Sequence, residues 1–302
     1  MRAAGRKKLF ELCTVPPGKR VKLGKYDSAW SKVQELKELS KDEIKDRAQA
    51  ILQENLAELA QAQALLYASD TYSVLLIFQA MDAAGKDGTI KHVMSGVNPQ
   101  GCQVSAFKVP SAEELDHDFL WRYWRGLPER GRIGIFNRSY YEEVLVVRVH
   151  PELLARQRLP PAKVGKSIWK ERYDDINAFE RHLTRNGTVI LKFFLNVSKD
   201  EQKKRFLDRL EDSDKHWKFS LADLAERAYW DEYMTAFEDA IEATSTKWAP
   251  WYIIPADRKW IARAVVAEIV ATTISSLDIA FPKPTKEQME AIKEAKRKLL
   301  AE

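Results

Sequence analysis

The chain has 302 residues, of which 45% are hydrophobic and 31% are charged; this is enough for a large buried core and excludes a disordered or fibrous protein. The first 26 residues carry eight basic side chains against one acidic side chain. The net charge of +5 therefore does not describe a uniformly basic surface that coats nucleic acid. Two cysteines are too few for a disulfide framework or a thiolate metal site. Without an apolar run that could span a bilayer or act as a signal peptide, we expect a cytoplasmic protein that binds neither nucleic acid nor membrane.

Residues 1–69 are predicted to form a basic arm followed by a helical preamble. Between residues 26 and 67, apolar side chains recur at spacings of three and four with charged side chains between them, which is the pattern of amphipathic helices. The arm is compatible with three roles: it wraps a neighbouring subunit, contacts an anionic ligand, or is disordered. The sequence does not choose among them.

Residues 70–281 are predicted to form a single α/β domain. The run 72–78 is apolar on both faces, which is typical of a buried parallel strand. Similar runs occupy residues 103–107, 132–136, 189–195 and 251–254, and helical patterns cover 112–125, 163–185, 199–210, 221–244 and 258–277. Strands that alternate with helices predict a doubly wound, five-stranded parallel sheet. Residues 282–302, which open on two prolines, predict a separate C-terminal helix.

The segment 80–89 joins the first strand to a helical pattern, which is the position of a phosphate-binding loop. In such a loop, backbone N–H groups face an anion and a lysine, here Lys86, reaches the phosphates of the ligand. The match to the P-loop (Walker A) motif is imperfect. Ala80 stands where the first glycine belongs, and Asp87 stands where a magnesium-binding Ser or Thr belongs.

Asp82 suggests where the missing metal ligand lies. A carboxylate next to phosphates is repelled unless a divalent cation bridges them, so Asp82 indicates a Mg²⁺ site within the loop. The alternative is a tight turn shaped by Gly85 and Gly88, in which Asp82 or Asp87 caps the following helix.

A second polar motif, which begins with Asn137 and Arg138, follows the predicted strand 132–136. Ligands of open α/β sheets bind at the carboxyl ends of strands. Asn137 stands where an Asp commonly helps to hold Mg²⁺, and Arg138 could stabilise charge on a transferring phosphoryl group. The alternative is a helix start capped by Asn137 or Ser139, with Glu142 and Glu143 near the N-terminus of the helix.

Three segments, 80–91, 136–144 and 215–220, strongly resemble the second family of polyphosphate kinases, and the likeness extends from about residue 20 to 280. The resemblance implies a thymidylate-kinase-like fold, Mg²⁺, and phosphoryl transfer between inorganic polyphosphate and a nucleotide. It also implies that Asp82 holds metal, that Lys86 contacts the transferring phosphate and that Arg138 stabilises the transition state. Asn137 departs from the Asp of much of the family and resembles the subgroup that phosphorylates both AMP and ADP. Family precedent suggests a homodimer or homotetramer.

The predicted site therefore has two parts around the loop. The predicted catalytic residues are Asp82, Lys86, Asn137 and Arg138, and Mg²⁺ is expected on Asp82 and Asn137, directly or through water. The residues predicted to contact nucleotide or phosphate are Ala83, Ala84, Gly85, Asp87, Gly88, Thr89, Glu142 and Glu143.

A charged stretch at about residues 208–221 predicts a helical lid that closes and excludes water. Polyphosphate carries a charge on every unit and no base, so its binding should depend on Lys and Arg contacts that weaken with salt. The predicted polyphosphate-binding residues are Lys91, Arg205, Arg209, Lys215 and Lys218. A solvated helix face is the alternative for this charge run.

The sequence thus predicts a kinase that forms ATP from ADP, and also uses AMP, with polyphosphate as the donor. Two other functions stay open. One is an ATP-dependent nucleoside monophosphate kinase on the same fold, and the other is a non-enzymatic protein that binds a polyanion or nucleotide through a degenerate loop.

Overall fold

The computed structural model describes residues 2–33, 36, 38–218 and 220–302. A mixed sheet of six strands lies at its centre, in the order β1-β6-β5-β2-β4-β3. The strands are β1 (Thr14–Val15), β2 (Ser73–Gln79), β3 (Cys102–Ala106), β4 (Ile133–Asn137), β5 (Thr188–Asn196) and β6 (Trp251–Pro255). The five predicted strands are present and parallel to one another. The predicted number of five is wrong by one, because β1 pairs antiparallel to β6 at the edge and is too short to leave a periodic signal.

Strand β2 lies between β5 and β4, and its seven residues are all buried, as the apolar run predicts. Phe78 is in register with Asn137 of β4 and with Phe193 of β5. Because parallel strands end at the same edge of the sheet, the loop after β2 and the turn after β4 emerge side by side. This register places the two predicted motifs next to each other.

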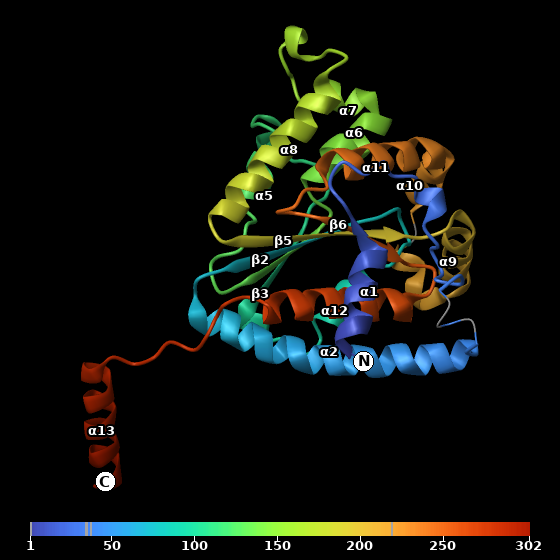
Figure 1. Ribbon diagram of the computed structural model, residues 1–302. Coiled ribbons are helices and arrows are strands. Elements are labelled where there is room, and N and C mark those ends of the chain that lie inside the picture. The colour runs from blue at the N-terminus through green and yellow to red at the C-terminus, as the bar shows by residue number, and fades with distance from the viewer. Residues whose placement is uncertain (1, 34–35, 37, 219) are drawn as a thin grey trace.

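Helices cover both faces of the sheet (Figure 1). On one face lie α2 (Lys41–Ser69), α3 (Lys86–Val93) and α12 (Lys259–Ser275), and on the other lie α8 (Ile168–Arg185) and α11 (Trp230–Thr244). Leu59 and Leu66 of α2 are fully buried in the same hydrophobic core as the strands. The long helix α2 accounts for most of the predicted preamble and packs along α12.

Shorter elements complete the chain. The α-helices are α1 (Arg2–Cys13), α4 (Ala112–Leu115), α5 (Trp121–Trp124), α6 (Val146–Val149), α7 (Pro151–Ala155), α9 (Lys199–Glu211), α10 (Leu221–Glu226) and α13 (Lys286–Leu300). The 3-10 helices are η1 (Leu23–Lys25), η3 (Pro99–Gly101), η4 (Tyr140–Val144), η5 (Pro161–Lys163), η6 (Ser213–Lys218) and η7 (Arg227–Tyr229).

Several predicted helices are divided. The pattern over 112–125 forms α4 and α5, because the Asp118 side chain accepts a hydrogen bond from the Leu120 backbone and competes with helix formation. The pattern over 221–244 forms α10, η7 and α11. Apolar periodicity locates a helical face, but it does not register such local breaks.

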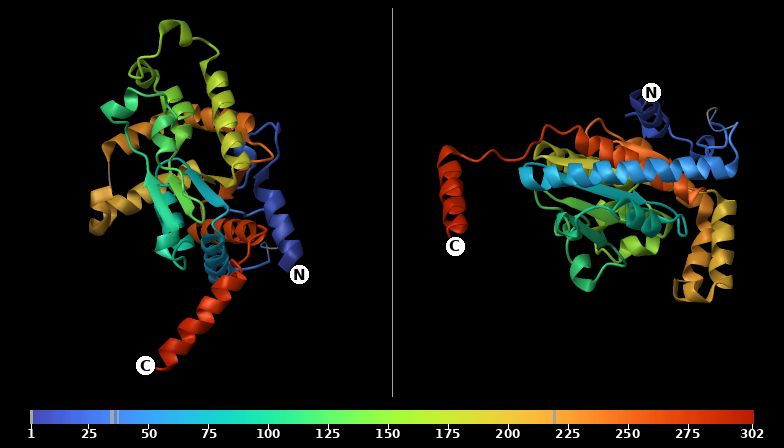
Figure 2. Two further views of the ribbon diagram at one scale, coloured as in Figure 1. Left: turned by 90° about the vertical axis from the view of Figure 1, so that its left-hand side faces the viewer. Right: turned by 90° about the horizontal axis from the view of Figure 1, so that it is seen from below.

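The two ends of the chain differ in their packing. The basic arm forms α1, in which Arg6 pairs with Glu58 at 2.5 Å and also with Glu268. Helix α13 stands apart from the body at the end opposite α9 (Figure 2). None of the helices in the described part of the chain is long and apolar enough to cross a membrane.

Candidate active site

The loop between β2 and α3 turns tightly, with two residues in the left-handed region of backbone conformation. Gly85, the N-cap of α3, has φ +104°, a conformation that L residues rarely adopt. Ala83 has φ +59°, in the left-handed region that disfavours side chains. Lys86 folds back and donates a hydrogen bond from Nζ to the Ala80 carbonyl at 2.9 Å. The backbone therefore bends tightly around the N-terminus of α3, where its N–H groups can bind phosphate.

The turn after β4 brings Arg138 to this loop. Arg138 also adopts a left-handed conformation, with φ +66°, and its N–H donates to the Phe78 carbonyl at 3.1 Å. Its guanidinium lies 3.1 Å from an oxygen of Asp82 and 3.4 Å from an oxygen of Glu142. Three of the predicted site residues are thus in direct contact.

Electrostatic interactions link the charged groups of this cluster. The carboxylate of Glu142, more than that of Asp82, raises the pKa of Arg138, against the effect of burial. Removal from water lowers the pKa of the Lys86 ammonium, and the nearby Arg138 lowers it further, while Asp82 opposes both effects. The cluster is therefore a mixed-charge site in which two cations lie close together, as suits a ligand with several negative charges.

The strand-end amide contacts the loop directly. The amide nitrogen of Asn137 donates to a carboxylate oxygen of Asp87 at 2.7 Å. The amide oxygen is the group of Asn137 that could contact a metal ion or its water. Ala84 lies in the loop and is buried, whereas Gly88 and the buried Thr89 lie in the first turn of α3.

Arg205 has a different role from the one predicted. Its side chain is only 4% exposed, and one terminal nitrogen donates to the carbonyls of Ala83 and Ala84 at 3.0 and 2.7 Å. The other donates to the carbonyls of Ala256 and Asp257 at 2.6 and 3.1 Å. These contacts occupy the guanidinium, so Arg205 supports the phosphate loop from behind and does not offer itself to polyphosphate.

Glu143, which the sequence predicts to contact nucleotide or phosphate, is instead buried away from the loop. It is 4% exposed and accepts hydrogen bonds from Gln157 at 2.6 Å and Arg172 at 3.4 Å. Adjacent residues of η4 point in different directions, so Glu142 faces Arg138 while Glu143 faces the interior.

The predicted polyphosphate residues are spread over α3 and the region of α9 to α10. Lys91 is exposed on α3. Arg209 lies 3.8 Å from a carboxylate oxygen of Asp223 on α10. The side chains of Lys215 and Lys218 lie outside the described part of the structure.

Asp223 is a site residue that sequence reasoning missed. Burial, followed by repulsion from Asp82, raises the pKa of Asp223, while Arg209, Arg138 and Lys86 oppose this shift. Helix α10, which follows the predicted lid, thus contributes a carboxylate to the same electrostatic cluster. Its only sequence signal is its place three residues after Ser220, the N-cap of α10, which is typical of a residue near a helix start and does not indicate this cluster.

The donor set is compatible with a Mg²⁺ ion. Within the described residues, no three His, Cys, Asp or Glu side chains are arranged to hold a metal. Mg²⁺ often takes one or two protein carboxylates and completes its shell with waters and substrate phosphates. Asp82 and Asp223 repel each other, and a divalent cation between them would relieve that repulsion.

Comparisons with a family model, with curated proteins and with solved structures agree with one another. The family model described as Polyphosphate kinase 2 (PPK2) matches residues 39–282. The chain is 52% identical to an ADP-polyphosphate phosphotransferase of Rhodopseudomonas palustris, over 95% of this chain and 96% of that protein. It is 47% identical to an AMP/ADP-polyphosphate phosphotransferase of Meiothermus ruber, over 78% and 84% of the two chains. The crystal structure of polyphosphate kinase 2 from Arthrobacter aurescens TC1 superimposes with a TM-score of 0.76 at 44% identity, covering 85% of this chain and 87% of that one.

Proposed function

The chain belongs to the polyphosphate kinase 2 family and is a polyphosphate-dependent nucleotide kinase, and from this premise we propose that it phosphorylates both ADP and AMP at the cluster around Arg138. A relative named as an ADP-polyphosphate phosphotransferase and one named as an AMP/ADP-polyphosphate phosphotransferase are 52% and 47% identical to the chain. The resemblance of the Asn137 motif to the subgroup that uses both nucleotides favours phosphorylation of both AMP and ADP.

The contact between Arg138 and Asp82 carries this proposal. It joins the turn after β4 to the phosphate loop at 3.1 Å, so both motifs would face one phosphoryl group. A terminal oxygen of the nucleotide would attack the terminal phosphorus of polyphosphate in line, and the bond to the bridging oxygen of the shortened chain would break. Lys86 and Arg138 would neutralise the charge on the transferring group, so that positioning and electrostatics supply the catalysis.

We further propose that Asp82 holds Mg²⁺, with Asp223 and the Asn137 amide oxygen as further or water-mediated ligands. When bound, Mg²⁺ would neutralise charge on the phosphate oxygens. The loop N–H groups from Ala83 to Gly88 would bind the phosphates near the N-terminus of α3.

The remaining roles are part of the same proposal. Arg209, Lys91, Lys215 and Lys218 would contact polyphosphate, and residues of about 208–221 would close as a lid over the reacting groups. We propose that the chain is divided into residues 1–69, 70–281 and 282–302 and that it assembles as a homodimer or homotetramer. We also propose a cytoplasmic location, because the thiols of Cys13 and Cys102 are free.

The test is ATP formation by the purified protein from ADP, and separately from AMP, with long-chain polyphosphate and Mg²⁺. We expect both reactions to occur and to be lost in Lys86→Ala. Lys170→Ala, which removes an exposed lysine of α8, is the matched control and should retain full activity. Product from ADP alone would contradict the dual-acceptor proposal, and a folded, active Lys86→Ala variant would contradict the site assignment.

A further inference from the structure

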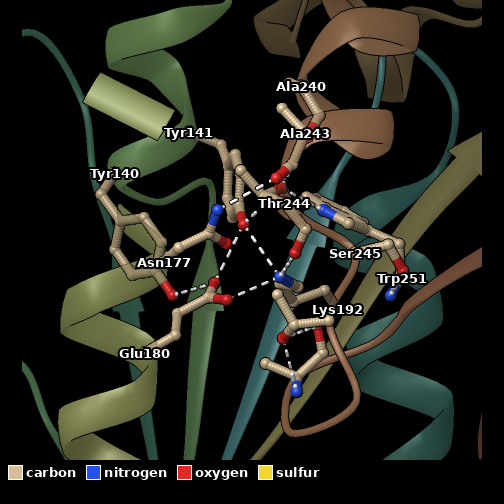
Figure 3. A network of polar contacts seen from close by, with 12 residues as sticks. Tyr140, Tyr141, Asn177, Glu180, Lys192, Ala240, Ala243, Thr244, Ser245 and Trp251 are labelled. Atoms are coloured by element: carbon tan, nitrogen blue, oxygen red, sulfur yellow. Dashed lines mark hydrogen bonds and ion pairs between the residues drawn. The ribbon is translucent and has the colours of Figure 1, made fainter. Parts of the chain in front are cut away.

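A lysine–glutamate pair lies in the core and contacts Tyr140 and Tyr141 (Figure 3). Lys192 of β5 and Glu180 of α8 are both fully buried. The Lys192 ammonium donates to Glu180 Oε2 at 2.6 Å, to the Thr244 carbonyl at 2.7 Å and to the Tyr141 hydroxyl at 3.0 Å. Its three hydrogens are therefore all used.

The second carboxylate oxygen of Glu180 accepts hydrogen bonds from two tyrosine hydroxyls. Glu180 Oε1 accepts hydrogen bonds from the Tyr140 hydroxyl at 2.8 Å and the Tyr141 hydroxyl at 2.9 Å. Both tyrosines are fully buried at the start of η4, and only Ser139 separates them from Arg138. The ion pair thus anchors the segment that immediately follows the arginine.

Stability alone does not explain this pair. Burial raises the pKa of Glu180 and lowers that of Lys192, and their mutual attraction opposes both shifts. Apolar side chains of similar volume often stabilise a core as well as a buried ion pair does. Apolar side chains, however, cannot accept hydrogen bonds from two phenols. The buried pair therefore differs from an apolar core in that it fixes the positions of Tyr140 and Tyr141.

The other side of the turn is fixed from the sheet. Arg138 N–H donates to the carbonyl of Phe78 at the end of β2. Ser139 Oγ accepts from the Gln79 amide and from the Tyr141 N–H, both at 3.3 Å. A left-handed conformation at a non-glycine residue persists only where its surroundings fix it. Here β2 fixes the turn on one side, and the tyrosines fix it on the other.

We propose that Glu180 and Lys192 are positioning residues for phosphoryl transfer. Through Tyr140 and Tyr141 they hold the turn that directs the Arg138 guanidinium toward Asp82. This inference rests on the proposed function of Arg138, although neither member of the buried pair touches the reacting groups.

The first test is a variant in which the network becomes apolar without leaving phenols unpartnered: Tyr140→Phe, Tyr141→Phe, Glu180→Met and Lys192→Met together. We expect this variant to fold, and its kcat to fall by about tenfold or more, because small displacements of a catalytic group are costly. KM for ADP and for polyphosphate should change much less. A folded variant with the kcat of the original protein would overturn the proposal.

Tyr140→Phe alone decides the question if the fourfold variant does not fold. It deletes one hydrogen bond and keeps the ring, so a lowered kcat is again expected and an unchanged one contradicts the proposal. Ser245→Ala is the matched control, because it removes a buried hydroxyl that bonds to Val15 and Trp251 and not to η4. This control should lose stability and keep its kcat.

The Arg138→Lys background separates this inference from the proposed function. If Tyr140 acts through Arg138, Tyr140→Phe should lower kcat much less in Arg138→Lys than in the original protein. Equal effects in the two backgrounds would contradict a positioning role. An Arg138→Lys protein with full activity would instead contradict the proposed function of the arginine itself.

Discussion

Asn137 donates its amide hydrogen to the carboxylate of Asp87 at 2.7 Å, so two of the three residues that depart from the usual phosphate-loop kinase pattern are hydrogen-bonded to each other. An aspartate at the strand end would place a second carboxylate within hydrogen-bonding distance of Asp87. The amide removes this repulsion and leaves one negative charge in the pair. Compared with the usual pattern, the carboxylate is thus in the first turn of α3 and not at the end of β4.

This relationship predicts the behaviour of an exchange. Asn137→Asp should lower kcat/KM by about 10- to 100-fold, the usual effect of disturbing groups around a metal site, because two carboxylates then face each other. Adding Asp87→Asn should restore much of the activity, since the pair again holds one amide and one carboxylate. Steady-state kinetics and Mg²⁺ titration of the two variants provide the measurement, and a double variant no better than Asn137→Asp would refute the pairing.

Arg205 gives a second prediction, because its guanidinium serves four backbone carbonyls around the loop. A lysine carries the charge but lacks the planar fork of donors. Arg205→Lys should therefore lower the free energy of unfolding by about 2 kcal/mol, as expected for buried acceptors that lose their donor. Urea denaturation gives this value.

The salt dependence of the KM for polyphosphate distinguishes support of the loop from direct binding. Arg209→Gln should flatten this dependence, because polyphosphate that binds with one cation–phosphate contact fewer releases fewer counterions. Arg205→Lys should leave the slope unchanged. A flatter slope in Arg205→Lys would show that Arg205 contacts polyphosphate directly.

The sequence predicts the parallel sheet and the contact between its two polar motifs because both follow from local signals: buried apolar runs, and polar residues directly after them. It does not predict β1, since Thr14 and Val15 form a strand only against β6. It also predicts Arg205 as a polyphosphate contact, because a run of basic residues on a helix does not reveal which of them is buried against another part of the chain. Tertiary contacts decide both cases.

Asp223 of α10 provides another prediction, since its carboxylate and that of Asp82 repel each other. Asp223→Asn should raise the Mg²⁺ concentration needed for half-maximal rate by about 10- to 100-fold. Thermal stability should not fall, because the substitution removes a like-charge repulsion. A Mg²⁺ titration of initial rates tests this, with Asp214→Asn, an exposed lid substitution, as the control; identical titrations for the two variants would remove Asp223 from the metal site.

Cys13 predicts a pH dependence of stability. The thiol is fully buried, and burial raises its pKa from 9.0 to about 12. The folded chain therefore holds this proton more tightly than the unfolded chain. The stabilisation is complete below pH 9 and is lost as the pH rises from 9 toward 12. At pH 10 the loss should be about 1.4 kcal/mol. Urea unfolding at pH 8 and pH 10 should show a smaller loss for Cys13→Ala than for the original protein, because alanine has no proton to release; equal losses would mean that the thiol of Cys13 ionises in the folded chain as readily as in the unfolded one.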